Sequence, residues 1–150
     1  MNEVLVPFTQ GAIETLTTML GLEANLGSDE RGEDCPLAAY VDLQGERTGR
    51  LVLSFPSSTA SFLVAEMMAV DLDEMDDELL HDGVGEVANM IAGYAKTQLA
   101  DTAYHFSLHL PSVVFGEDEK RALVESFPVV YHNRIDTEEG YFEVAVYFES

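Results

Sequence analysis

Apolar side chains recur at helical spacing along the first part of the chain. Five of them lie three or four positions apart and so share one face of a helix: Leu5, Phe8, Ala12, Leu16 and Leu20. This pattern predicts a helix from about Asn2 to Leu22, with Gly21 able to end it. The polar and charged stretch that follows, residues 23–36, is typical of a loop.

Two runs of strand-forming residues flank a turn between Gly45 and Gly49, so residues 37–55 predict a β-hairpin. A second helix is expected over residues 57–70, with Ser57 or Ser58 as its N-cap. Its apolar side consists of Phe62, Val64, Ala65, Met68 and Ala69. The acidic residues 71–82 form either a connector or the first turns of a third helix, which runs to about Ala100.

The last third of the chain is rich in strand patterns. Strand candidates lie at residues 104–111, 112–116, 127–136 and 141–149, the last two joined by a tight turn. In the final strand, apolar residues alternate with more polar ones, which predicts one buried face and one solvated face. Its edges would need a neighbouring strand or a cover. The order of elements predicts one α+β domain over residues 1–150, in which an antiparallel-rich sheet packs with an N-terminal helix and a central helix pair.

The charge of the chain narrows the classes of partner. Seven Lys and Arg residues against 28 Asp and Glu residues give a net charge of −21. Phosphate contacts need a basic face, so this balance argues against binding to nucleic acid or to an anionic membrane. The chain has no apolar run long enough to span a bilayer, and its first residues do not resemble a signal peptide. We therefore expect a soluble, cytoplasmic protein whose charge mainly serves solubility.

Residues 82–96, DGVGEVANMIAGYAK, carry the most informative pattern. Their apolar face consists of Val84, Val87, Ile91 and Tyr94. The same helix contains three glycines, each costing roughly 1 kcal/mol relative to alanine in a helix interior. Glu86 and Asn89 are three positions apart and therefore share a face, with Asp82 one turn earlier.

Short residues lie around this acid and amide: Gly85, Ala92 and Gly93. They leave a bare surface that another backbone can approach closely, whereas an ordinary solvated face would be more stable with Ala, Lys or Glu at these positions. Gly83 has a simpler explanation, as part of the first turn of the helix. The alternative reading of the pattern is that the acid and the amide are ordinary solvent-facing residues.

The spacing Asp82-x-x-x-Glu86-x-x-Asn89 resembles the D/S-x-x-x-E-x-x-N signature of the CheC/CheX/FliY chemotaxis phosphatases. Gly93 matches a glycine that is usual just after this signature. Residues 107–116, SLHLPSVVFG, resemble the L-P-x-V-x-x-G segment that follows the motif helix in CheX-type proteins. The resemblance therefore implies a CheC/CheX-like fold along nearly the whole chain.

The number of motif copies distinguishes the types within this family. CheC-type members usually carry two motif helices, and this chain has one. The N-terminal helix has Glu14 and Thr17 at the matching spacing, which is not the motif. One copy and this chain length are similar to the CheX type.

The resemblance implies a phosphatase that hydrolyses the phospho-aspartate of a CheY-like response regulator. Asn89 would orient the attacking water, and Glu86 would pair with the active-site lysine of the regulator. The surface that contacts the partner would consist of Asp82, Gly85, Ala92 and Gly93. Asp82 has a second reading, which we favour, as a residue that caps or charges the start of the helix.

The same resemblance implies that the chain binds no cofactor, that Mg²⁺ belongs to the regulator's site, and that two copies form a homodimer by joining their sheets. The rival function is a non-catalytic module that binds receiver domains or flagellar and chemotaxis components through the same helix face. The amide of Asn89 favours catalysis, because docking alone has no evident need for it.

Other chemistry-bearing residues favour structural roles. His105 and His109 are four positions apart, but they lie on a predicted strand and have no clear third ligand, so we expect no metal site there. Cys35 is the only cysteine, which excludes an intrachain disulfide and fits a reducing compartment. Its position in a loop before Pro36 favours an unreactive thiol over a nucleophile.

Overall fold

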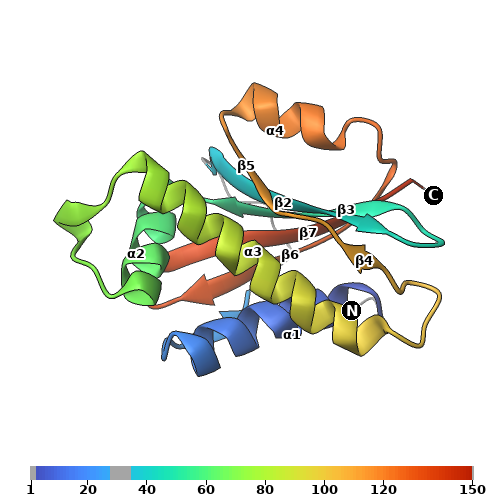
Figure 1. Cartoon of the computed structure of the whole chain (residues 1–150), viewed down its shortest axis with the longest axis horizontal. Coiled ribbons are helices and arrows are strands. Elements are labelled where there is room, and N and C mark those ends of the chain that lie inside the picture. Colours follow the sequence, from blue (N-terminus) through green and yellow to red (C-terminus); the bar gives the residue numbers. More distant parts are fainter. Residues whose placement is uncertain (1–2, 28–34, 150) are drawn as a thin grey trace.

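The fold is seen in a computed structural model that describes residues 3–27 and 35–149 (Figure 1). The helices are α1 (Leu5–Glu14), which continues as a π-helical turn (Thr15–Met19), α2 (Ser57–Met68), a short 3₁₀ helix (Leu72–Glu74), α3 (Asp77–Leu99) and α4 (Glu117–Val124). The strands are β1 (Ala24–Leu26), β2 (Leu37–Gln44), β3 (Gly49–Phe55), β4 (Ser107–Leu108), β5 (Ser112–Phe115), β6 (Val129–Thr137) and β7 (Gly140–Phe148).

All seven strands belong to one antiparallel sheet with the order β1-β6-β7-β3-β2-β4, and β5 also pairs with β2. The predicted hairpin is present, with Leu43 of β2 opposite Gly49 of β3. β7 lies between β6 and β3, so both of its edges are paired. The predicted α+β class, with its antiparallel sheet, N-terminal helix and central helix pair, is confirmed.

Helices cover both faces of the sheet. Figure 1 shows α1, α2 and α3 on one side and α4 on the other. The main core lies on the α1–α3 side and takes its β7 residues from one face of that strand: Phe142, Val144, Val146 and Phe148. A smaller cluster lies on the α4 side and includes Ala145 and Tyr147 of the opposite face. The prediction of a half-solvated final strand is therefore wrong, because α4 covers the second face.

α4 is the element that the hydrophobic pattern did not predict. It has a single buried residue, Leu123, so it shows almost no apolar periodicity. The charge pattern could have predicted this helix, because acidic residues favour a helix start and basic residues favour a helix end. The helix begins with Glu117, Asp118 and Glu119 and has Arg121 in its last turn. The predicted loop at 23–36 was also wrong in part, because residues 24–26 form β1 against β6, while residues 28–34 lie outside the described residues.

The helix ends show which caps the structure uses. The N-terminal helix agrees with its prediction and is followed by Gly21, which has a φ of +67°. The N-cap of α2 is Pro56 and no side chain caps it, so the predicted Ser57 or Ser58 cap is wrong. α3 begins at Asp77, and its N-cap Asp76 accepts a hydrogen bond from the backbone N–H of Leu79 at 2.8 Å. The acidic connector therefore supplies the 3₁₀ helix and the first turn of α3.

Candidate functional site

Four of the residues singled out by the sequence lie in a row along the outer side of α3. Asp82 and Glu86 are exposed, and Asn89 and Gly93 are half-buried. Spacings of four, three and four residues place them on one stripe of the helix, which we call the α3 strip. The opposite side of α3 is held in the core by Val84, Val87, Ala88 and Ile91. Burial of that side fixes the rotation of the helix and so presents the strip outward.

The structure corrects two readings at the start of α3. Asp82 does not cap the helix, because the cap is Asp76 and Asp82 lies in the second turn. Gly83 is not in the first turn either. It packs against α2, where an added Cβ would come within 2.5 Å of both methyl carbons of Val64. Asp82 thus remains a member of the exposed strip, and Gly83 belongs to the helix–helix contact.

The expectation of a bare surface around the acid and amide holds for only one of the three small residues. Ala92 is fully buried in the core, and Gly85 is buried beneath the segment between β4 and β5. A Cβ on Gly85 would lie 3.7 Å from Cγ of Pro111 and 3.8 Å from a methyl carbon of Val113. A Cβ on Gly93 would meet nothing within 4 Å. The groups that pack on Gly85 are therefore side chains of the chain itself, at distances that an added Cβ would tolerate, and Gly93 alone adjoins open space.

The acid and amide of the strip are available to an external partner. Over residues 3–27 and 35–149, no hydrogen bond or ion pair engages the side chain of Glu86 or Asn89. A carboxylate accepts hydrogen bonds from a cation, and a carboxamide both donates and accepts. The arrangement can dock a basic group and orient a polar molecule such as water. It contains no hydroxyl, thiol or amine that could act as a nucleophile.

Within residues 3–27 and 35–149, no three His, Cys, Asp or Glu side chains are grouped so that they could hold a metal ion. His105 lies in the turn after α3, with Nδ1 2.8 Å from the carbonyl oxygen of Thr102. Within the same residues, no helix is both long and apolar enough to cross a membrane.

The single cysteine is buried where β2 begins. The residue is 2% exposed, and burial raises the pKa of the Cys35 thiol. A raised pKa keeps the thiol protonated and weakly nucleophilic. The prediction of an unreactive cysteine is therefore supported, although the residue lies in the protein interior instead of an open loop.

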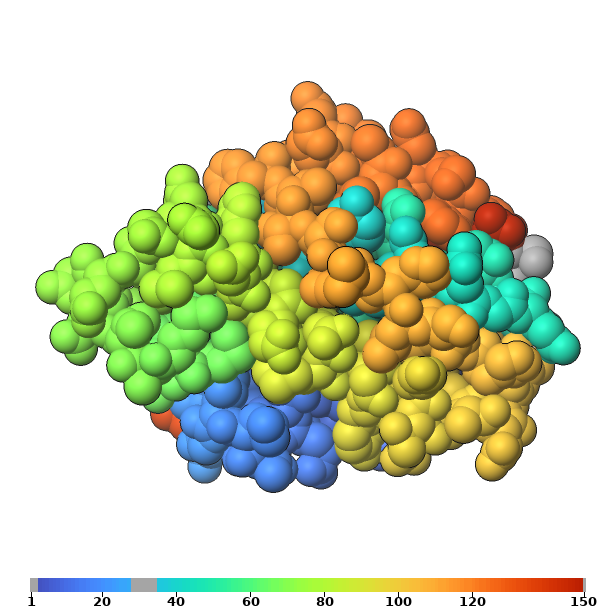
Figure 2. Space-filling model, viewed as in Figure 1, coloured from blue at the N-terminus to red at the C-terminus, as the bar shows by residue number. Residues whose placement is uncertain are grey.

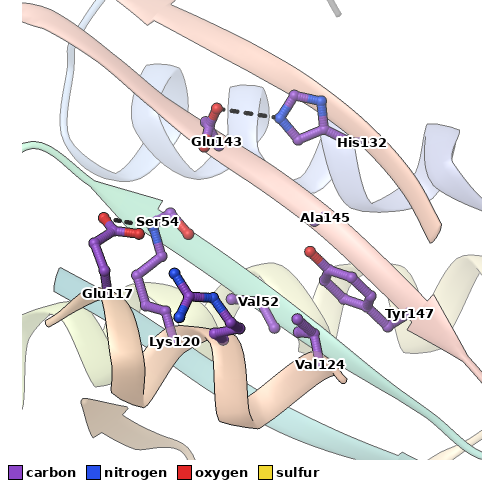
Figure 3. Close-up of a pocket in the computed structure, with 10 residues that line it drawn as sticks. Val52, Ser54, Glu117, Lys120, Val124, His132, Glu143, Ala145 and Tyr147 are labelled. Atoms are coloured by element: carbon purple, nitrogen blue, oxygen red, sulfur yellow. Dashed lines mark hydrogen bonds and ion pairs between the residues drawn. The ribbon is translucent and has the colours of Figure 1, made fainter. Parts of the chain in front are cut away.

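A pocket of about 210 Å³ lies between α4 and the sheet, away from the α3 strip (Figure 3). Four of its polar side chains form two contacts. His132 and Glu143 face each other across two strands with 3.3 Å between Nε2 and Oε1, and Lys120 lies 3.8 Å from Glu117. Lys120 also donates to the carbonyl oxygen of Cys35 at 2.5 Å. Of these contacts, the one from Lys120 to Cys35 links α4 to the start of β2. The sequence did not predict the pocket because it did not predict α4.

Comparisons with known families and proteins show which family the chain matches. Residues 37–132 match the family model described as chemotaxis phosphatase CheX. The chain is 32% identical over 121 residues to the CheY-P phosphatase CheX of Thermotoga maritima, covering 78% of this chain and 76% of that protein.

Solved structures share the fold over nearly the entire chain. A chemotaxis protein CheX from Desulfovibrio desulfuricans superposes with a TM-score of 0.78 at 26% identity, covering 99% of this chain and 100% of that one. CheX in a CheX–CheY–BeF₃–Mg²⁺ complex from Borrelia burgdorferi superposes with a TM-score of 0.80 at 22% identity, covering 99% of each chain.

Proposed function

The chain belongs to the chemotaxis phosphatase CheX family, and from this premise we propose that it hydrolyses the phospho-aspartate of a CheY-like response regulator. The proposal rests on one observation. Glu86 and Asn89 lie on the same strip of α3, and neither side chain has a partner among the described residues. The curated relative from Thermotoga maritima is named for this activity.

In the proposed reaction, water attacks the phosphorus of the phospho-aspartate in line with the bond to the aspartate oxygen. That P–O bond breaks, the carboxylate leaves with its electron pair, and the water proton passes to a phosphate oxygen or to solvent. Such a reaction depends on positioning and charge stabilisation more than on covalent help. Asn89 supplies the positioning, because its carboxamide can accept a hydrogen bond from the water while donating another to a phosphoryl oxygen.

Glu86 has the docking role in this proposal. Its carboxylate pairs with the active-site lysine of the regulator and so sets the position of Asn89, about one helical turn away. Asp82 adds a contact at one end of the strip, and Gly93 gives the space at the other. Mg²⁺ is a component of the regulator's site, consistent with its presence in the Borrelia burgdorferi complex with CheY.

A non-catalytic docking module is the second candidate, since the same strip would bind a receiver domain without accelerating hydrolysis. Asn89 favours the catalytic reading, because a carboxamide adds little to docking but can orient water. A homodimer remains what the family resemblance implies, and a cytoplasmic location remains a prediction from the sequence. Sedimentation of the purified chain tests the first of these.

The proposed function is tested by following the loss of phosphate from a phosphorylated receiver domain of the same organism, with and without this chain. We expect catalytic amounts of the chain to accelerate the decay. We expect removal of Mg²⁺ to act through the receiver's site, because the ion is proposed to belong to the receiver and not to this chain. Stoichiometric binding without acceleration would favour the docking module. No binding to any phosphorylated receiver of the organism would overturn both candidates.

A further inference from the structure

Two large hydrophobic side chains stand in solvent beside the α3 strip. Leu110 is 90% exposed, the highest value for any large hydrophobic residue that the structure describes, and Phe115 is 59% exposed. Burying an apolar side chain is favourable, so two such residues on one short segment mark a surface that gains from being covered. Both belong to the segment that runs from β4 through β5.

The contacts of Gly85 place this segment against the strip. Pro111 and Val113 approach Gly85, which precedes Glu86 and lies one turn before Asn89. Phe115 points to the same side as Val113, because alternate residues of a strand share a face. Figure 2 shows the orange segment lying along the yellow-green surface of α3. We call this set the apolar rim: Leu110, Pro111, Val113 and Phe115.

We propose that the apolar rim is a second part of the docking surface, and that Leu110 and Phe115 become buried against apolar side chains that border the phospho-aspartate of the regulator. This inference rests on the proposed function. A stable protein interface covers about 800 Å² on each partner, which corresponds to a disc of roughly 16 Å radius. Gly85 and Asn89 are only about 6 Å apart along the helix axis. A regulator that brings its phosphoryl group to Asn89 therefore also covers the rim.

The position of the rim argues against a second copy of this chain as its occupant. A copy seated there would cover Glu86 and Asn89 and exclude the regulator.

Charge gives a further reason for an apolar contact at this place. The chain carries a net charge of −21, which repels an acidic partner, whereas apolar burial attracts a partner of either sign.

The two parts of the surface then have separable effects. The rim contributes to binding of the regulator before and during hydrolysis, so its loss raises KM and leaves kcat nearly unchanged. Asn89 acts on the reacting atoms, so its loss lowers kcat. This division gives Leu110 and Phe115 a kinetic signature that a purely structural role would not produce.

The experiment compares Leu110→Ser and Phe115→Ser with the unmodified chain. One measurement is the affinity for the receiver domain loaded with beryllofluoride and Mg²⁺, and the other is the KM and kcat for the phosphorylated receiver. We expect each variant to weaken binding and raise KM by about tenfold to a hundredfold, with kcat within about twofold. Leu110→Met should retain affinity, because methionine is a similar apolar side chain. The matched control is Leu26→Ser, which removes an exposed leucine from β1 at the opposite edge of the sheet and should change neither value.

Unchanged affinity and KM in both serine variants would overturn the rim proposal while the proposed function stands. A loss of self-association in these variants, with receiver affinity preserved, would also overturn it and would assign the rim to a second copy. An unmodified chain that neither binds nor dephosphorylates the receiver would overturn the proposed function, and the rim proposal with it. Unfolding curves of the variants show whether any loss comes from misfolding.

Discussion

Gly83 of α3 and Val64 of α2 are in such close contact that a Cβ on the glycine would lie 2.5 Å from both methyl carbons of the valine. The small residue lets the two helices approach, and the approach holds the first half of α3 in place. The α3 strip begins at the preceding residue. Gly93, ten positions further along the same helix, has nothing within 4 Å of an added Cβ. Two glycines of one helix thus serve different purposes.

This difference predicts opposite effects of one substitution. Both Gly83→Ala and Gly93→Ala gain the same helix propensity, of about 1 kcal/mol. Gly83→Ala must also displace the stiff side chain of Val64, and overpacking of a well-packed core costs roughly 1–3 kcal/mol. In urea unfolding, we expect Gly93→Ala to be as stable as the unmodified chain or more so, and Gly83→Ala to be less stable than Gly93→Ala by roughly that overpacking cost. Equal stabilities of the two variants would show that α2 and α3 can separate without cost.

Local patterns were sufficient to predict most of the fold. Helical spacing of Leu5, Phe8 and Leu16 gave the N-terminal helix, and the strand-forming runs on either side of Gly45 gave the hairpin, because both signals lie within a few residues of one another. α4 could not be predicted in this way. It is held to the sheet by contacts with residues far along the chain, such as the hydrogen bond from Arg50 to the carbonyl oxygen of Leu123 at 2.7 Å.

The candidate site shows the same limit. Sequence spacing was enough to place Glu86 and Asn89 on one face, since that depends only on the helical repeat. The surroundings of the strip depend on what packs beside it. Pro111 and Val113 cover Gly85, and this contact joins residues more than twenty positions apart, so no pattern within the helix could predict it. The same absence of local signal hid the exposure of Leu110.

Asn89 gives the most direct prediction about catalysis. Asn89→Ala should lower kcat on the order of 10²-fold, because it removes the group proposed to orient the attacking water. Affinity for the beryllofluoride-loaded receiver should change little. Asn25→Ala, which removes an exposed amide from β1, is the control and should behave like the unmodified chain. A kcat in Asn89→Ala equal to that of the unmodified chain would remove the catalytic role from this residue.

Glu86 should show a different kinetic pattern. Glu86→Ala removes a charged docking contact, so it should raise KM about tenfold or more and also reduce kcat, because poor docking misplaces Asn89. The control is Glu66→Ala, which removes an exposed carboxylate from α2 and changes the net charge by the same amount. If both variants raise KM equally, the effect comes from overall charge and not from a specific contact.

The buried cysteine gives a prediction about alkaline stability. Burial raises the pKa of the Cys35 thiol in the folded chain, whereas in the unfolded chain it ionises near pH 8.5. Its contribution to stability is therefore fully present below about pH 8.5 and is lost as pH rises through the folded pKa. We expect the free energy of unfolding to fall more steeply between pH 8 and about pH 10 for the unmodified chain than for Cys35→Ser. The pKa of Tyr141 is raised by its burial and also by Cys35, so the difference between the two profiles reports the Cys35–Tyr141 pair. Parallel pH profiles for the two chains would contradict this assignment.

The open space at Gly93 tests whether the regulator uses the end of the strip. Gly93→Leu should fold with at least the stability of the unmodified chain, because leucine is the better helix former and the added side chain meets no other part of the described molecule within 4 Å of its Cβ. The leucine should nevertheless fill the space through which the regulator approaches Asn89. We expect kcat/KM for the phosphorylated receiver to fall by at least tenfold, while Gly93→Ala, with its much smaller side chain, loses less.

A Gly93→Leu variant with normal stability and full activity would show that the docked regulator leaves this end of α3 uncovered. A variant with reduced stability would instead mean that Gly93 lies closer to the core than its surroundings indicate.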